Sequence, residues 1–176
     1  MEKTNWVIDP THSEVGFKVK HMMFTNLSGK FNLFEATIEN EAEHFETSKI
    51  SFSADVNSVN TNNDDRDDHL TGADFFDAEK FPKLSFVSTS LKKISENKFQ
   101  IVGDLTIKDV TASVSLDTEY SGLMTDPWGN TKIGLSLNGK INRKDFGLTW
   151  NSTLETGGVL VGEDIKLLSE IQFIKQ

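Results

Sequence analysis

The sequence predicts an all-β fold, an eight-stranded antiparallel closed barrel with one short helical insert. About eight long segments alternate apolar and polar residues with a period of two, the pattern of strands buried on one face. Short turns join most of these segments, and no helix alternates with them, which excludes a parallel α/β sheet. The helical insert, residues 61–81, follows the third strand.

Length and composition indicate one globular domain. A chain of 176 residues can bury a sizeable core but is short for two domains, so we expect a single domain over residues 1–176. Apolar residues make up 36% and charged residues 26%, which is a globular rather than a disordered composition. The thirteen phenylalanines must be buried in a core or around an apolar ligand.

Charge and residue usage exclude several classes of function. The net charge of -9 repels phosphate backbones and anionic bilayer surfaces, so we expect no nucleic-acid partner and no polybasic membrane docking. The lack of cysteine excludes disulfides, thiolate metal sites and cysteine nucleophiles. The amino-terminal residues show no signal-peptide pattern, and no apolar run approaches the roughly 18 residues of a spanning helix. The expectation is a cytoplasmic protein without an integral membrane segment.

The chain begins with strand patterns. Residues 6–9 predict a short lead-in strand that ends before Pro10, and residues 13–24 predict a half-buried strand. One face of this second strand carries Val15, Phe17, Val19, His21 and Met23.

Two further strands precede the insert. Residues 27–29 predict a hairpin turn that leads into a strand over residues 30–39. The alternation slips between Phe31 and Phe34, which indicates a β-bulge. Residues 48–59 show the cleanest alternation of the first half.

The insert has the signals of a short helix. Residues 61–63 are good N-cap residues, Asp64 and Asp65 suit the positive end of the helix dipole, and Gly72 can stop the helix. Phe75 and Phe76 are expected in a second helical turn that ends before Pro82. Such a segment can act as a lid for a barrel or as an ordinary cap on a core.

The second half of the chain repeats the strand pattern. A turn at residues 96–97, a loop at 122–130 and an irregular piece at 143–158 separate its strands. The strands are expected within residues 84–91, 99–107, 110–120, 133–141 and 165–173.

An eight-stranded barrel either packs its own interior or holds one small ligand. Small residues near the middle of the strands leave room for a ligand, and they can equally accept phenylalanines from across the barrel. The sequence alone leaves both alternatives open. The positions concerned are Ala54, Gly103, Ala112, Gly139 and Ser169.

The polar residues carry no specific catalytic or metal signature. The four histidines lack metal-ligand spacing, so we expect no metal, and the alternation places His21 inward as a core residue. The cluster from Arg66 to His69 is either a solvated helix end or a contact for a polar head group. Arg143 is either a polar rim beside Phe146 or part of a surface ion pair. No nucleophile or nucleotide motif is present, so we assign no catalytic residue and no cofactor.

Several motifs, in this order, resemble the YceI-like or polyisoprenoid-binding family over nearly the whole chain. They are WVIDPTHSEVGFKVKHMMF, LSGKF, RDDHLTGADFFDAEKFPKLSFVST, GDLTIKDVTASVSL and INRKDFGLTW. The chain departs from the family at Asp109 and Ala112, where Gly and Lys are common.

The resemblance implies an extended, lipocalin-like barrel whose apolar pore holds a long isoprenoid, quinone-tail or fatty-chain amphiphile. Members are not established enzymes, many carry a signal peptide, and some form dimers, so a homodimer is possible here.

We therefore expect a carrier, store or sequestering protein for one long apolar amphiphile. The alternative is an enzyme, a hydrolase or isomerase of a lipid-like substrate with His21 or His69 as base. For the polar end of the ligand we nominate His21, Arg66, His69 and Arg143. The nominated pocket walls are Val15, Phe17, Val19, Phe31, Phe52, Phe75, Phe76, Phe86, Ile101, Leu105, Leu135, Leu137, Ile171 and Phe173.

Overall fold

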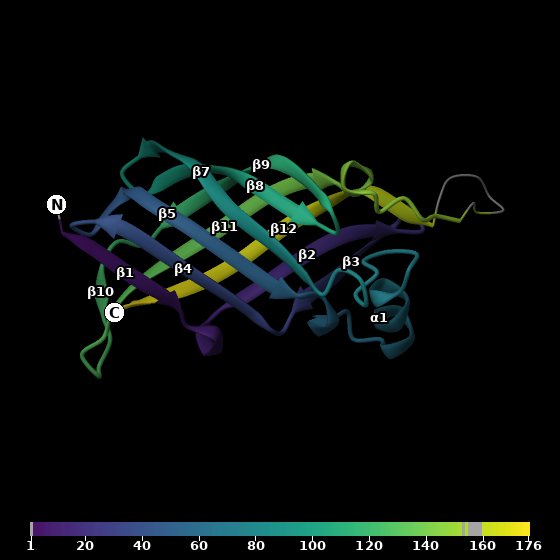
Figure 1. The fold of residues 1–176 in the computed structure, drawn as a ribbon, viewed down its shortest axis with the longest axis horizontal. Helices are drawn as coiled ribbons and strands as arrows, with labels where there is room; N and C mark the ends of the chain where they lie inside the picture. Colours follow the sequence, from purple (N-terminus) through teal and green to yellow (C-terminus); the bar gives the residue numbers. More distant parts are fainter. Residues whose placement is uncertain (1, 153, 155–159) are drawn as a thin grey trace.

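Eight antiparallel strands close into an elongated barrel in the computed structural model (Figure 1). The structure describes residues 2–152, 154 and 160–176. The predicted eight-stranded antiparallel barrel is confirmed. In spatial order the ring consists of β1 (Lys3–Ile8), β4 (Phe34–Glu41), β5 (His44–Asp55), β7 (Lys83–Ser95), β8 (Lys98–Ile107), β9 (Val110–Tyr120), β11 (Thr131–Asn142) and β12 (Val161–Lys175), which pairs with β1 again.

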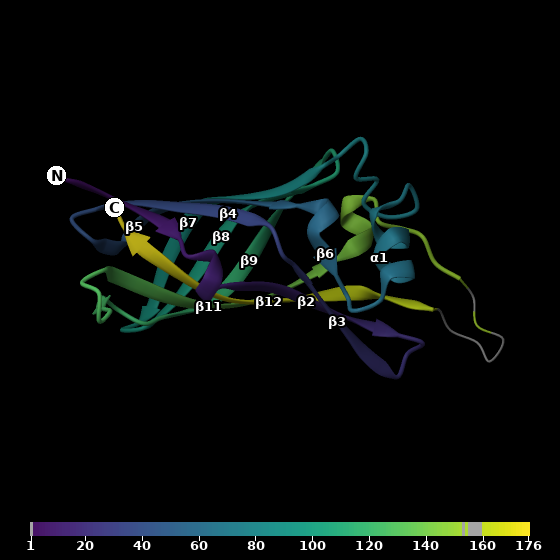
Figure 2. The ribbon, with the colours of Figure 1, turned by 90° about the horizontal axis from the view of Figure 1, so that it is seen from below.

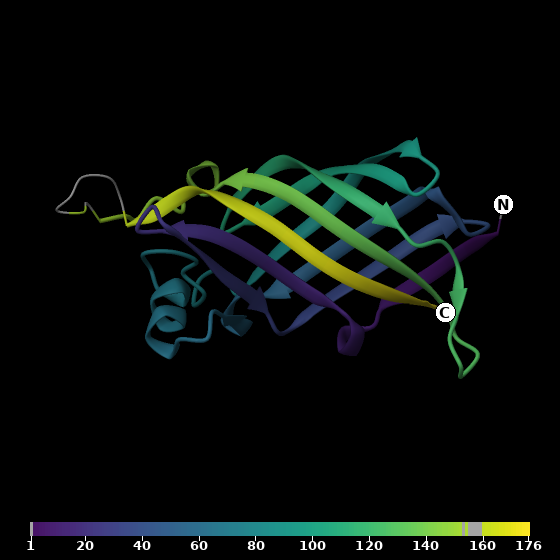
Figure 3. The same cartoon turned by 180° about the vertical axis from the view of Figure 1, so that it is seen from behind.

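One wall of the barrel is built from a broken strand. β12 pairs along the same edge first with β2 (Glu14–His21) and then with β1. The short 3₁₀ turn η1 (Pro10–His12) separates these two halves. β3 (Thr25–Phe31) continues the wall beside β2 and ends against β6 (Val59–Asn60). At the opposite end of the barrel, β10 (Met124–Thr125) pairs with the start of β11. Figure 3 shows β12 running along the whole length of this wall.

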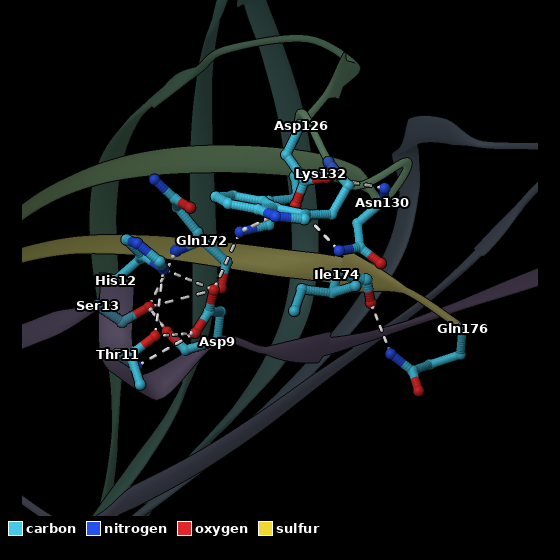
Figure 4. A network of polar contacts seen from close by, with 11 residues as sticks. Asp9, Thr11, His12, Ser13, Asp126, Asn130, Lys132, Gln172, Ile174 and Gln176 are labelled. Atoms are coloured by element: carbon cyan, nitrogen blue, oxygen red, sulfur yellow. Dashed lines mark hydrogen bonds and ion pairs between the residues drawn. The ribbon is translucent and has the colours of Figure 1, made fainter.

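A polar network holds the break in place (Figure 4). The Asp9 carboxylate accepts hydrogen bonds from Thr11 Oγ1 at 2.8 Å and Lys132 Nζ at 3.1 Å, and it contacts His12 Nδ1 at 2.8 Å. Ser13 Oγ donates to the Asp9 carbonyl at 2.6 Å and accepts from the Gln172 amide at 3.0 Å. The network therefore ties the corner between β1 and β2 to β11 and β12.

This network also sets the ionisation of Asp9. Burial alone would raise the pKa of its carboxyl, but the hydrogen bonds from Thr11, His12 and Lys132 outweigh burial and hold that pKa well below its usual range. Asp9 is therefore a carboxylate at neutral pH. Since its partners come from the turn η1 and from β11, its charge stabilises the join between segments that are distant in the sequence.

The end of the barrel that holds both chain termini is packed solid. Phe45 stacks on Tyr120 with ring centroids 4.4 Å apart, and Phe99 meets Phe45 edge-on at 4.8 Å. Trp6 is buried beside them in the core, and its indole N–H donates to Asn40 Oδ1 at 3.1 Å. These aromatic rings fill the interior on this side.

The helical insert lies at the opposite end. α1 (Asp64–Thr71) sits where the β2–β3 hairpin diverges from the rest of the barrel, which Figure 2 shows from below. The helix begins after Asn63, whose side chain accepts from the Arg66 amide at 2.9 Å, and it ends before Gly72, so the predicted caps are confirmed. The 3₁₀ turns η2 (Val56–Ser58) and η3 (Arg143–Phe146) flank the same end.

Two local predictions about the first hairpin are wrong. Residues 27–29 lie inside β3, and the turn is formed by Met22 and Met23, whose φ angles are 52° and 65°. Gly29 is not a turn residue. A glycine is needed at this position because a Cβ would lie 2.3 Å from the ring of Phe17. The slip in alternation reflects a strand end and not a bulge, because β3 ends at Phe31 and β4 begins at Phe34.

The second helical turn expected at Phe75 and Phe76 is also absent. The Phe75 amide donates to Gly72 O at 3.1 Å and the Phe76 amide to Leu70 O at 3.0 Å, a series of turns that folds back under α1. Gly72 ends the helix, and this fold-back leaves both phenylalanines facing the barrel. Among the described residues, no helix combines the length and the apolar character that crossing a bilayer requires.

Candidate functional site

An apolar cavity of about 220 Å³ lies inside the barrel, and its lining runs from the lid residues next to α1 along β12 to Phe173. All fourteen apolar residues nominated as pocket walls line it, and so does Arg143. Apart from Gly16, Ser169 and Arg143, every described residue of the lining is apolar. Such a lining excludes water and suits a hydrocarbon chain. That these side chains contact a ligand stays a prediction.

The small inward residues serve both of the purposes that the sequence left open. A Cβ at Gly103 would lie 2.4 Å from the Phe86 ring, and one at Gly139 would lie 2.6 Å from Leu116 Cδ2, so neighbouring side chains cover these two glycines. Ser169 instead lines the open cavity. The glycines allow bulky side chains to lie flat against the wall, and space remains along the middle of the barrel.

The lid over the cavity is the apolar part of the insert. Leu70, Phe75 and Phe76 line the cavity from above. The Phe76 ring meets Phe31 of β3 edge-on at 6.1 Å, and Phe75 lies 5.4 Å from Trp150. The lid therefore contacts β3 on one side and Trp150 on the other side of this end of the cavity, which we call the mouth. Aromatic packing holds it there.

The charged part of the insert points away from the cavity. Arg66 Nε donates to Thr61 Oγ1 at 2.7 Å, and its Nη2 donates to the Thr61 carbonyl at 2.6 Å. Asp67 accepts from the amide and the hydroxyl of the same buried threonine at 2.9 and 2.6 Å. Arg66 thus anchors the start of α1 and does not line the cavity.

Neither candidate histidine lines the cavity. His69 Nε2 contacts Asp74 Oδ2 at 2.9 Å, and its ring lies edge-on to Trp150 at 4.6 Å, behind Phe75. His21 lies at the end of β2, two residues beyond Val19 of the cavity wall, and is half-buried. In the described part of the chain, no three His, Asp or Glu side chains form a group that could hold a metal ion.

Arg143 is the charged residue among the described cavity-lining residues, and the sequence interpretation of it as part of a surface ion pair is wrong. Its side chain is 2% exposed. Its guanidinium donates to four carbonyl oxygens: Nη1 to Leu148 at 2.6 Å and Trp150 at 2.9 Å, Nε to Gly162 at 2.8 Å, and Nη2 to Val161 at 3.3 Å. The surface ion pair of this region belongs to Lys144 and Glu163, at 2.7 Å.

The charge of Arg143 is only weakly compensated. Burial lowers the pKa of its guanidinium, and the more distant Glu163 carboxylate opposes that effect. Within the described residues Arg143 makes no ion pair, and four of its five N–H donors are used. The remaining donor and the positive charge suit a carbonyl, carboxylate or phosphate oxygen at the end of a ligand.

Several other lining residues were not among the predicted pocket walls. Ile50, Ile107, Ile141 and Leu167 follow the same alternation as their nominated neighbours, so the strand pattern could have identified them. Leu148 lies in the irregular piece after η3, where no periodicity exists to place it.

Comparison with known proteins agrees with this architecture. The model of the YceI-like domain family matches residues 6–173. A UPF0312 protein of Staphylococcus aureus (strain MSSA476) is 37% identical over 171 residues, which is 97% of both chains. The crystal structure of a Campylobacter jejuni YceI protein is 37% identical, covers 96% of both chains and has a TM-score of 0.77. A polyisoprenoid binding domain from Saccharophagus degradans shares the fold, with 12% identity, a TM-score of 0.67 and coverage of 97% of this chain and 98% of that domain.

Proposed function

The chain belongs to the YceI-like domain family, and from that premise we propose that it binds one long apolar amphiphile inside the barrel as a carrier, store or sequestering protein. The observation that carries the proposal is the cavity beneath the lid, whose lining is apolar except at Gly16, Ser169 and Arg143. The Saccharophagus degradans domain of the same fold is described as polyisoprenoid binding, which favours an isoprenoid chain here.

The length of the lining favours a long chain. The lining extends along β12 from Val161 to Phe173, twelve residues apart. At about 3.3 Å per residue and a strand tilt of about 40°, this distance is about 30 Å along the barrel axis. Two acyl chains end to end span about the same 30 Å in a bilayer core. An isoprenoid or quinone tail therefore fits the length better than one ordinary fatty chain.

We place the polar end of the ligand at Arg143. Because this guanidinium lies at the end of the cavity next to the lid, the head group would lie near the mouth and the apolar tail would point toward the packed end. The tail supplies most of the affinity, since each buried methylene contributes about 0.8 kcal/mol and one head-group hydrogen bond only about 1 kcal/mol.

The test is a titration with prenyl alcohols of increasing length, after extraction of the purified protein with organic solvent and mass spectrometry of the extract. Affinity should rise about fourfold per added methylene equivalent until the cavity is full. A protein that yields no lipid and whose affinity does not depend on chain length would contradict the proposal.

Two variants of adjacent residues sharpen this test. Ser169→Trp blocks the cavity four residues before its inner end at Phe173, so the chain length at which affinity saturates should fall by about a third. Glu170→Trp places the same indole on the exposed face of β12 and should leave that length unchanged.

The double variant His21→Gln/His69→Gln tests the enzyme alternative. It should keep the chain-length dependence of binding, whereas loss of a lipid-converting activity in this variant would favour an enzyme.

A further inference from the structure

The tip of the β2–β3 hairpin exposes three consecutive large apolar side chains. Met22 is 42% exposed, Met23 59% and Phe24 82%. The tip extends beyond the barrel at the α1 end, where Figure 2 shows the hairpin diverging from the neighbouring strands. A run of exposed apolar residues is unfavourable in water and is typical of an interaction surface.

The turn itself does not require these side chains. Met22 and Met23 both have positive φ, a conformation in which Asn and Gly are preferred. In the two-residue loop of the β4–β5 hairpin, Ala42 and Glu43 also have positive φ angles, 48° and 64°. A small and a charged residue thus suffice for this geometry elsewhere in the chain. The bulky apolar residues at Met22 and Met23 therefore need a different explanation.

The tip is continuous with the cavity wall. Val19, three residues before Met22, lines the cavity, and so does Val161, which pairs with His21. The Met22 amide donates to Leu160 O at 2.8 Å, which fixes the tip against the start of β12. An apolar chain that enters at the tip therefore passes the half-buried His21 and then meets Val19 and Val161 of the cavity wall.

The two sides of the mouth carry opposite charge. The β2–β3 hairpin, residues 14–31, has three lysines against one glutamate, a net charge of +2 in a chain of -9. The insert, residues 61–81, has seven acidic residues against Arg66 and Lys80, a net charge of -5. Lipid phosphates would attract the exposed Lys18 and Lys20 and repel the insert, so a membrane surface would select one orientation.

We propose that the β2–β3 hairpin docks the mouth of the barrel on a lipid bilayer, with Met22, Met23 and Phe24 in the interface and Lys18 and Lys20 at the phosphates. This docking rests on the proposed function, because it gives a membrane-resident amphiphile a direct path into the cavity. The overall charge of -9 opposes adsorption by charge alone, so apolar insertion supplies most of the affinity.

The experiment compares Phe24→Asp with a matched variant at the other end of the barrel. Trp128 follows β10 and is also 82% exposed, so Trp128→Asp removes an equally exposed aromatic ring. Ligand-free protein is sedimented with vesicles of phosphatidylcholine that contain a minor fraction of phosphatidylglycerol. Affinity for farnesol in solution is measured separately, without vesicles.

We expect Phe24→Asp to lower vesicle partition about 10- to 100-fold, the effect of removing one buried phenylalanine, while Trp128→Asp partitions like the wild type. Both variants should bind farnesol like the wild type. Equal partition of Phe24→Asp and wild type, or an equal loss in Trp128→Asp, would overturn the docking proposal. Failure of the proposed function would appear differently, as absence of farnesol binding in all three proteins.

Discussion

Replacement of Arg143 by methionine tests whether its guanidinium holds the mouth of the barrel together. The four carbonyl oxygens that it joins belong to Leu148, Trp150, Val161 and Gly162. At about 1 kcal/mol of net stabilisation per bond, losing all four removes about 4 kcal/mol. The methionine offsets part of this loss because it is uncharged, so folding no longer has to remove a charged group from water.

The expected net loss for Arg143→Met is about 3 kcal/mol, or a fall in melting temperature of about 6–12 °C for a chain of this size. Thermal unfolding followed by circular dichroism measures it. Lys144→Met is the matched control, because its ion pair with Glu163 is about half exposed and should contribute less than about 1 kcal/mol.

Arg143→Lys separates charge from geometry. The lysine ammonium keeps the positive charge but cannot reach four carbonyls arranged around a planar fork. The stability of Arg143→Lys should therefore fall between those of the wild type and Arg143→Met. Amides in residues 148–152 should exchange hydrogen faster in both variants. This role of Arg143 would be refuted if Arg143→Lys were as stable as the wild type, or if Arg143→Met and Lys144→Met had the same melting temperature.

Two further predictions concern the frame of the barrel. Since the folded-state pKa of Asp9 is depressed, its contribution is complete above the unfolded pKa of about 3.9 and is lost as pH falls through the folded pKa. Asp9→Asn should therefore lower the free energy of unfolding by about 2 kcal/mol at pH 7. On acidification the variant should lose less further stability than the wild type, and melting temperatures that depend on pH in the same way in both proteins would contradict this. Gly103→Ala should destabilise by about 1–3 kcal/mol because its Cβ would meet the Phe86 ring at 2.4 Å and Val87 O at 2.5 Å. Denaturant unfolding measures this loss, Phe86→Leu should restore part of it, and a fully stable Gly103→Ala would show that the strands yield more easily than this geometry indicates.

The sequence alone determined which side chains face inward. Alternation with a period of two depends only on local backbone geometry, so the inward positions of Phe17, Phe52 and Leu135 could be assigned before any strand was paired. The caps of α1 were also predictable, because Asn63 and Gly72 act on the backbone within a few residues. The motifs that indicated the family lie in these same segments.

Long-range pairing decided the rest. The break between β1 and β2 depends on β12, which joins Ile8 to Phe173 across nearly the whole chain, and no local pattern encodes that partner. Local patterns also misplaced the first turn. The local pattern places Gly29 in a turn, but a glycine is needed there because any side chain would collide with Phe17 on the neighbouring strand. Side-chain contacts between distant segments cannot be read from spacing.

Arg143 shows the same division. Its sequence neighbours, Lys144 and Asp145, made it resemble a surface charge, and only the tertiary structure brings the carbonyls of Leu148, Trp150, Val161 and Gly162 around it. A buried cation is stable only where many acceptors converge, and here they converge because residues 148–150 lie against the start of β12. The sequence by itself therefore determined a barrel with apolar inward faces, and the tertiary structure decided that a cavity remains inside it, which end is open and where its charge lies.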